Sequence, residues 1–265
     1  MQWVADVGGA TGRSIAYLGG LAEISAKALQ LLVLSPLKRS RMLQRAIHEA
    51  VAAGVGAIPI VSLIAFFVGV IIALQGAYEL QRLGAMQLVA SLVAIAITRE
   101  LGPLITAIVV IGRSGSAFAA EIGTMRVTEE LDALKTMALD PVAFLVVPKF
   151  LAMAVMLPCL TIWADLMGVL GGSLFGVVGG GYTFGGYMLA TRDALVLRDI
   201  TSGVIKSLVF GMVITAVGCQ EGFTTGSGAE EVGRSTTSAV VISILLVILI
   251  DLIFTALFYL ARGGN

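Results

Sequence analysis

The chain has 265 residues, of which 58% are hydrophobic and 13% are charged. Soluble domains average about 45–50% apolar and about 25% charged residues, so this composition excludes an ordinary soluble protein. The 17 basic and 17 acidic residues cancel, and nothing in this balance favours nucleic-acid binding. The single histidine, His48, excludes a multi-histidine metal site. Cys159 and Cys219 both lie in apolar runs, which favours buried thiols over a disulfide.

Residues 14–34 are apolar but interrupted by Glu23 and Lys27, which lie four residues apart on one helical face. The other face can hold four leucines, Leu18, Leu21, Leu29 and Leu32. This pattern predicts a helix that lies in the membrane interface rather than a span. No cationic stretch precedes an apolar run at the N-terminus, so we expect no cleaved signal peptide.

Five apolar runs are long enough to cross a membrane, which takes about 20 residues of helix. They cover residues 51–78, 84–112, 150–178, 200–219 and 235–260. The fourth is the weakest, because it reaches spanning length only by extending back past Lys206. The sequence therefore predicts an all-α membrane protein in one domain over residues 1–265. Residues 1–50 form a cytoplasmic or interfacial region, and residues 51–260 form the transmembrane region.

The distribution of Lys and Arg between the loops predicts the orientation. Eight basic residues lie before the first run or between the second and third, namely Lys38, Arg39, Arg41, Arg45, Arg113, Arg126, Lys135 and Lys149. Three lie in the loops on the opposite side, namely Arg82, Arg192 and Arg198. We therefore expect a cytoplasmic N-terminus and, with five spans, a C-terminus on the outer side.

Charged residues within the spans are the strongest candidates for a functional site. Arg99 and Glu100 lie midway along the second run, where each costs at least about 2.5 kcal/mol to insert. Adjacent helical residues point about 100° apart, so at least one of the two needs another partner. Pro103 predicts a kink nearby. A structural ion pair that joins helices remains the alternative interpretation.

Other intramembrane features are less specific. Gly168, Gly172, Gly176 and Gly180 recur every four residues, which predicts a face for close helix packing. Asp165 and Asp251 are lone acids that either lie near a span end or pair with a basic residue. Gln75 and Tyr78 end the first run on its outer side, where tyrosine is also common as an interfacial residue.

Residues 113–149 contain a short amphipathic helix between the second and third runs. Thr128 is predicted as its N-cap, and Pro141 ends it. Three acids favour its N-terminal end, namely Glu129, Glu130 and Asp132. An apolar stripe is formed by Leu131, Leu134 and Met137. Such a helix either lies on the membrane as a connector or docks against a partner protein.

No G-x-x-x-x-G-K-[ST] motif occurs in the sequence, and the glycine-rich residues 112–116 do not follow a soluble strand. We therefore expect a non-enzymatic chain that hydrolyses no ATP itself and holds no cofactor or metal.

The stretch GRSGSAFAAEIGTMRVTEELDALKTMALDPVAFLVVPKFLA, residues 112–152, closely resembles the signature of the MlaE/YrbE permease family. TRELGP, at residues 98–103, and GSGAEEVGRSTTSAVV, at residues 226–241, fit the same family. The resemblance extends over about residues 45–260. Residues 179–200 depart most from the family pattern.

The resemblance implies a homodimeric permease in the bacterial inner membrane that moves phospholipids between the inner and outer membranes and maintains lipid asymmetry. It implies four further partners or ligands: a cytoplasmic ABC ATPase that binds ATP and magnesium, a STAS-domain protein, a periplasmic MCE-domain protein and the phospholipid itself. It also implies an interfacial N-terminal helix and a cytoplasmic coupling helix.

The family's functional positions map onto two groups of residues. The lipid pocket corresponds to Gln75, Tyr78, Arg99 and Glu100. The ATPase-coupling region corresponds to Glu121, Arg126, Glu129, Glu130, Leu131, Leu134 and Asp140. From the residues alone, the main rival is an ion-coupled secondary transporter with Arg99, Glu100, Asp165 and Asp251 as a relay. An intramembrane enzyme lacks a nucleophile–base set, and a scaffold without a lipid path is the remaining alternative.

Overall fold

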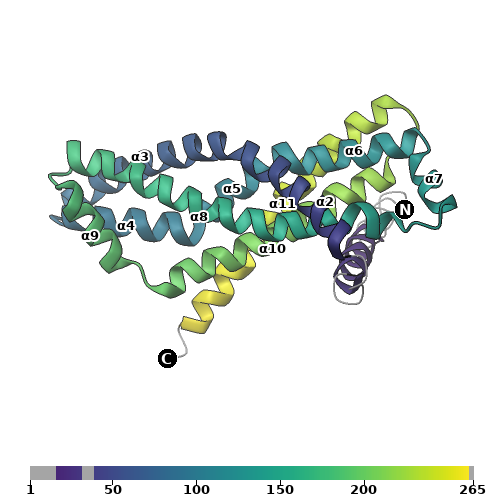
Figure 1. Ribbon diagram of the computed structural model, residues 1–265. Helices are drawn as coiled ribbons and strands as arrows, with labels where there is room; N and C mark the ends of the chain where they lie inside the picture. The colour runs from purple at the N-terminus through teal and green to yellow at the C-terminus, as the bar shows by residue number, and fades with distance from the viewer. Residues whose placement is uncertain (1–15, 32–38, 263–265) are drawn as a thin grey trace, which may run out of the picture.

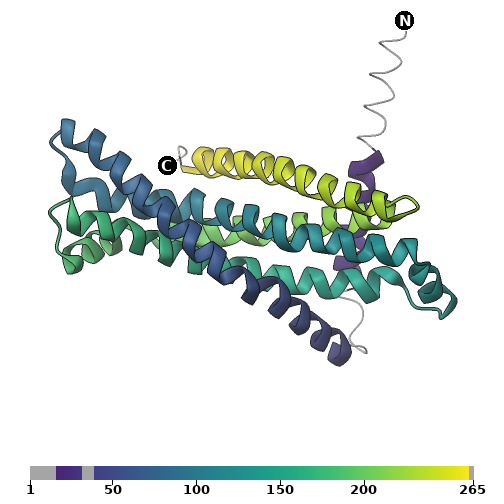
Figure 2. The same cartoon turned by 90° about the horizontal axis from the view of Figure 1, so that it is seen from above.

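The computed structural model describes residues 16–31 and 39–262, except for the side chains of residues 39–41 and 261–262. Within these residues the chain is helical and contains no strand. Figures 1 and 2 show an elongated bundle of long helices, with the short helix α7 and the N-terminal helix (residues 16–31) at one end and α9 at the other. The expectations for Leu32, Lys38, the side chains of Arg39 and Arg41, and a signal peptide fall outside the described residues.

Five helical segments of the described chain are long and apolar enough to cross a membrane. They are Met42–Arg82, Met86–Val127, Val142–Val178, Leu197–Thr224 and Ala229–Leu260. The predicted number of spans is therefore confirmed, including the weak fourth span. Each segment is longer than the apolar run that predicted it, because the helix continues past at least one end of the part suited to hydrocarbon.

The first span is built from α2 (Arg39–Gly54), the 3₁₀ turn η2 (Val55–Ala57) and α3 (Ile58–Arg82). The second contains η3 (Met86–Leu88), α4 (Val89–Ala96), η4 (Ile97–Leu101), α5 (Gly102–Val110), η5 (Ile111–Gly115) and α6 (Ser116–Val127). The helix α7 (Glu130–Thr136) follows. The rest of the chain consists of η6 (Val142–Val146), α8 (Val147–Val178), α9 (Phe184–Ala194), α10 (Leu197–Thr224) and α11 (Ala229–Arg262).

The second span is not a uniform α-helix, because η4 and η5 are π-helical turns. Pro103 is near the start of α5 and has no N–H to donate, so a regular α-helical ladder cannot continue through this position. The N–H of Gly102 instead bonds to the carbonyl of Ile97, five residues back. The sequence predicted a kink at this depth, and the structure has a widened turn immediately before the proline.

Glycines bring α3 and α8 into close contact. A Cβ added to Gly69 would overlap the carbonyl oxygen of Gly168, and one added to Gly171 would overlap the carbonyl oxygen of Phe66. These are backbone atoms and cannot move aside as a flexible side chain can. The two helices therefore approach as closely as glycine allows, which is a common way of packing helices in lipid.

The four glycines singled out from the sequence do not share one partner. Gly168 is buried against Ile97, whereas Gly172 and Gly176 are buried against the ring of Tyr187 on α9. Gly180 does not lie on this helix face, because α8 ends at Val178. The predicted face is therefore shorter than expected and contacts several elements, including α3, α4, η4 and α9.

Lys149 is not a loop residue, contrary to its use in predicting the orientation. It lies in α8 with its side chain fully buried, and its Nζ is 2.6 Å from Glu49 Oε1 and 2.7 Å from Glu121 Oε2. The two carboxylates compensate the buried charge, so a lysine is tolerated here. One side chain thus joins α2, α6 and α8 near the α7 end of the bundle.

The cap predicted for α7 is wrong. Thr128 is instead the C-cap of α6, and its hydroxyl donates to the carbonyl of Thr124 at 3.0 Å. The residue preceding α7 is Glu129, which has a positive φ of 62° and makes no capping hydrogen bond with its side chain. Glu130 and Asp132 do lie in the first turn of α7, as the sequence predicted.

Candidate functional site

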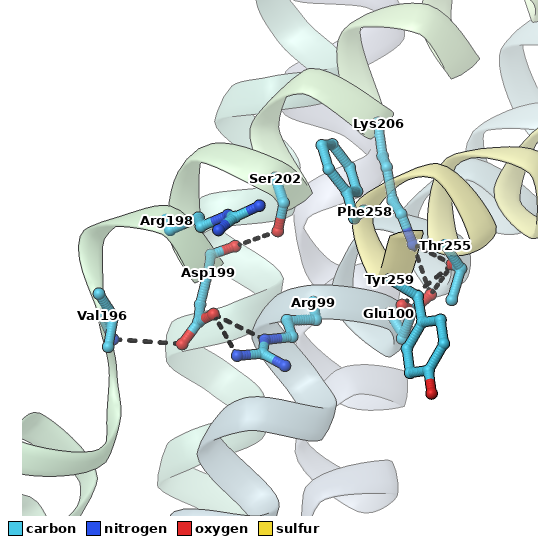
Figure 3. Close-up of a pocket in the computed structure, with 10 residues that line it drawn as sticks. All are labelled: Arg99, Glu100, Val196, Arg198, Asp199, Ser202, Lys206, Thr255, Phe258 and Tyr259. Atoms are coloured by element: carbon cyan, nitrogen blue, oxygen red, sulfur yellow. Dashed lines mark hydrogen bonds and ion pairs between the residues drawn. The ribbon is translucent and has the colours of Figure 1, made fainter. Parts of the chain in front are cut away.

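A cavity of about 370 Å³ opens between η4, the start of α10 and the end of α11. Its lining combines charged and polar side chains with one aliphatic and two aromatic ones (Figure 3). The lining residues are Arg99, Glu100, Val196, Arg198, Asp199, Ser202, Lys206, Thr255, Phe258 and Tyr259. The three elements come from the second, fourth and fifth spans, so the site exists only in the folded bundle.

The first ionic contact of the cavity joins η4 to α10. Both Nε and Nη2 of Arg99 lie 2.6 Å from Oδ1 of Asp199. The other carboxylate oxygen, Oδ2, accepts the backbone N–H of Val196 at 3.2 Å and so caps the start of α10. Asp199 is buried, and these donors satisfy both of its oxygens.

The second contact centres on Lys206, whose side chain is almost fully buried. Its Nζ lies 2.5 Å from Glu100 Oε2 and 2.8 Å from the hydroxyl of Thr255. It also lies 2.9 Å from Oδ1 of Asp251, an ion pair without the alignment of a hydrogen bond. The Thr255 hydroxyl is within 3.1 Å of Glu100 Oε1, so the carboxylate is held from two helices.

Arg99 and Glu100 therefore have separate partners, as their divergent directions on a helix require. The prediction that at least one of them needs another partner is confirmed, and both do. Of the two alternatives left open for Asp251, a place near a span end or a basic partner, the structure shows the partner, which is Lys206. The ion pairs stabilise the charges where isolated ones would be costly.

Sequence reasoning missed the partners Asp199 and Lys206. They lie seven residues apart on α10, which places them on the same helix face. Arg99 and Glu100 carry the complementary charges in another span. Lys206 was visible in the sequence as the charge that made the fourth run look weak as a span, and Asp199 directly precedes that run.

Gln75 and Tyr78 do not line this cavity. Both are exposed on α3, and the ring of Tyr78 lies 5.6 Å from the guanidinium of Arg82. Within a single chain the structure thus brings together only half of the lipid-pocket residues implied by the family resemblance.

Asp165 stands apart from the ionic contacts of the cavity. Its Oδ1 is buried beside Gly102, where a Cβ would overlap it, and has no hydrogen-bond partner among the described residues. The sequence offered two alternatives for Asp165, a place near a span end or a basic partner. Neither holds, because Asp165 lies within α8 and has no basic partner in the described part of the chain.

In the predicted coupling region, the two leucines expected to contact a partner protein are buried within the chain. Leu131 and Leu134 are buried in a core cluster that includes Leu21 of the N-terminal helix. Their exposure to a partner was therefore wrongly predicted, because the chain's own N-terminal helix contributes to covering them. Met137 is 62% exposed and is the member of the stripe that faces outward.

The charged residues of this region divide into tethered and free groups. Asp140 pairs with Lys27 of the N-terminal helix at 2.9 Å, and Glu121 pairs with Lys149. The hydrogen bond from Lys135 lowers the pKa of Asp132 on the outer face of α7. Arg126, Glu129 and Glu130 are exposed. Residues 121–140 therefore present a largely polar surface with one large exposed apolar side chain, Met137.

The family description "Permease MlaE" matches residues 46–257, which is most of the chain and includes every residue that lines the cavity except Phe258 and Tyr259. The chain belongs to the MlaE permease family. A probable ABC transporter permease protein of Rickettsia prowazekii is 39% identical over 225 residues, which cover 85% of this chain and 87% of that protein. The coarse function is therefore that of a multi-pass membrane permease of an ABC transporter.

Two further relatives have names that refer to lipids. The intermembrane phospholipid transport system permease protein MlaE of Haemophilus influenzae is 35% identical over 207 residues, covering 78% of this chain and 79% of that protein. The chloroplastic protein trigalactosyldiacylglycerol 1 of Arabidopsis thaliana is 40% identical over 199 residues, covering 75% of this chain and 57% of that protein.

Proposed function

We propose that this permease moves phospholipids between the inner and outer membranes and thereby maintains outer-membrane lipid asymmetry, with the cavity at Arg99 and Glu100 receiving the headgroup. The observation that carries the proposal is a cavity with charged walls inside a bundle of apolar spans. The cost of charge at this depth favours a polar ligand as the reason for it. The name of the Haemophilus relative supports a phospholipid as that ligand.

The apolar residues at the cavity suit acyl chains. Phe258 and Tyr259 line it, and the part of α11 that precedes them exposes leucines and isoleucines. A phospholipid is amphipathic, so its headgroup can enter the charged part while its chains lie along this face. Gln75 and Tyr78, which lie outside the single-chain cavity, would complete it in a homodimer.

Energy would come from a cytoplasmic ABC ATPase that binds ATP and magnesium. In this proposal the exposed part of residues 121–140 contacts the ATPase, and its closure moves the attached helices. Lys149 supports such a role, because it ties Glu121 of α6 to α2 and α8. A STAS-domain protein and a periplasmic MCE-domain protein would complete the complex in the bacterial inner membrane.

Two variants separate lipid handling from ATPase coupling. Glu100→Ala should leave the ATPase bound and reduce ATP-driven lipid transfer by at least tenfold, because the cavity loses a carboxylate. Met137→Asp should weaken co-purification of the ATPase, since an exposed apolar contact becomes an unpaired charge. Pull-down and a lipid-transfer assay in reconstituted vesicles measure the two effects.

The proposal would be wrong if Glu100→Ala transfers lipid at the parental rate. It would also fail if the permease transports on an ion gradient without any ATPase, which is the expectation of a secondary transporter.

A further inference from the structure

The charged side chains around the cavity are not all compensated. Arg99 is bound to Asp199, but Arg198 forms no ion pair and its guanidinium donates no hydrogen bond to any described residue. Arg198 is exposed and lines the cavity beside Ser202 (Figure 3). A guanidinium has five N–H donors arranged to bind phosphate oxygens in pairs. The Arg198 side of the cavity is therefore a positive pole with free donors.

The opposite side of the cavity has an excess of negative charge. Two carboxylates, Glu100 and Asp251, share a single cation, Lys206, so this group of three has a formal charge of −1. Glu100 lines the cavity and is 38% exposed, whereas Asp251 lies behind it and is not part of the lining. A carboxylate has about four acceptor positions, and those of Glu100 are not all filled by Lys206 and Thr255. This side is a negative pole with free acceptors.

The two poles are separated across the cavity, with Arg198 and Glu100 on opposite sides in Figure 3. A ligand that carries a phosphate and an ammonium group complements both of them at once. An anionic headgroup without an amine brings no cation to balance the excess negative charge at Glu100, and a quaternary ammonium group has no N–H to donate to it.

From this charge arrangement we infer that the cavity selects zwitterionic phospholipids with a primary ammonium group, the phosphatidylethanolamine class. Arg198 binds the phosphate and Glu100 accepts hydrogen bonds from the ammonium group. The inference rests on the proposed function, namely that a lipid headgroup enters this cavity, and adds the headgroup class and the residue that determines it.

The test measures binding to the purified full-length permease by native mass spectrometry, with three lipids of identical acyl chains. Phosphatidylethanolamine should bind about tenfold more tightly than phosphatidylglycerol or phosphatidylcholine, the difference expected from one hydrogen bond between charged groups. Glu100→Gln should abolish this preference without weakening phosphatidylglycerol, because the amide keeps the shape of the side chain but not its charge. Asp251→Asn should reduce the preference as well, because it removes the excess charge without altering the lining.

Arg198→Gln should weaken all three lipids by about tenfold, since each of them carries a phosphate. The matched control is Arg192→Gln on α9, an exposed arginine that does not line the cavity, and it should change nothing. Equal binding of phosphatidylethanolamine and phosphatidylglycerol to the parental protein would overturn the inference. So would a preference that survives in both Glu100→Gln and Asp251→Asn.

These outcomes differ from failure of the proposed function. If the headgroup inference alone is wrong, Arg198→Gln still weakens lipid binding, but the parental protein shows no preference for phosphatidylethanolamine. If the cavity receives no lipid, none of the cavity variants changes the binding of any of the three lipids.

Discussion

The side chain of Lys206 lies between Glu100, Asp251 and Thr255. Lys206→Met should lower the free energy of unfolding by about 3 kcal/mol, since it leaves two carboxylates close together without a cation. Thermal unfolding of the purified permease in detergent measures this loss.

The matched control is Lys135→Met, which breaks the exposed pair with Asp132 and should cost less than about 1 kcal/mol. Adding Glu100→Gln and Asp251→Asn to Lys206→Met should recover most of the stability, because no unpaired charge then remains. A Lys206→Met protein as stable as the parent would show that the lysine does not hold the carboxylates together.

At the residue scale the sequence predicted that Arg99 and Glu100 form part of a site, but not what completes it. The rule that adjacent helical residues diverge is local, so the need for another partner could be derived. The partners lie about a hundred residues away in α10, and only the packing of helices determines which charges meet. Leu131 and Leu134 were misjudged for a related reason, because the helix that helps cover them lies far away in the sequence.

Among the helices, the contact of α3 with α8 depends on the absence of side chains at glycine. Gly171→Ala should destabilise the protein by about 1–3 kcal/mol, because the new Cβ overlaps the carbonyl oxygen of Phe66 and the helices must separate. Thermal unfolding in detergent detects this change, and lipid transfer should fall in parallel.

Gly233→Ala in α11 is the matched control, since a Cβ there meets nothing within 4 Å. Alanine favours helix more than glycine does, so this variant should be as stable as the parent or more so. If Gly171→Ala is equally stable, α3 and α8 do not need their close approach.

The helices themselves followed from the apolar runs, because a segment in lipid must satisfy its backbone hydrogen bonds internally. The π-helical turns that interrupt the second span could be predicted from the sequence only in part. Pro103 indicated a disturbance near residue 100, whereas nothing in the sequence indicated the second π-helical turn at Ile111–Gly115. Such a turn depends on how neighbouring helices pack, and no single residue type encodes it.

At the scale of the whole molecule, the arrangement of α7 and α9 at opposite ends of the bundle makes the orientation testable. We expect α7 to lie in the cytoplasm and α9 in the periplasm, from the distribution of lysine and arginine. In a protein without Cys159 and Cys219, Asp193→Cys on α9 should react with a membrane-impermeant maleimide in spheroplasts.

Thr136→Cys on α7 should react with the same reagent only after the membrane is permeabilised. The reverse pattern would invert the orientation, and labelling of both positions from one side would contradict the single span, Val142–Val178, that separates them. The number and order of spans could be predicted because hydrophobicity is a property of each segment alone. The cavity could not, because it joins the second, fourth and fifth spans.

The π-helical turn at Ile97–Leu101 has a consequence for chain length. It holds one residue more than an α-helical turn of the same kind, so the helices on either side keep their alignment although the chain between them is longer by one. Loss of one residue here would form an ordinary turn and leave both ends of the span in place. The same loss within the uninterrupted α11 would rotate everything after it by about 100°. Natural length differences of one residue between related permeases should therefore fall at residues 97–101, 111–115 or 142–146. A loss at residues 97–101 should change which charged side chain reaches α10 without changing where the span begins and ends.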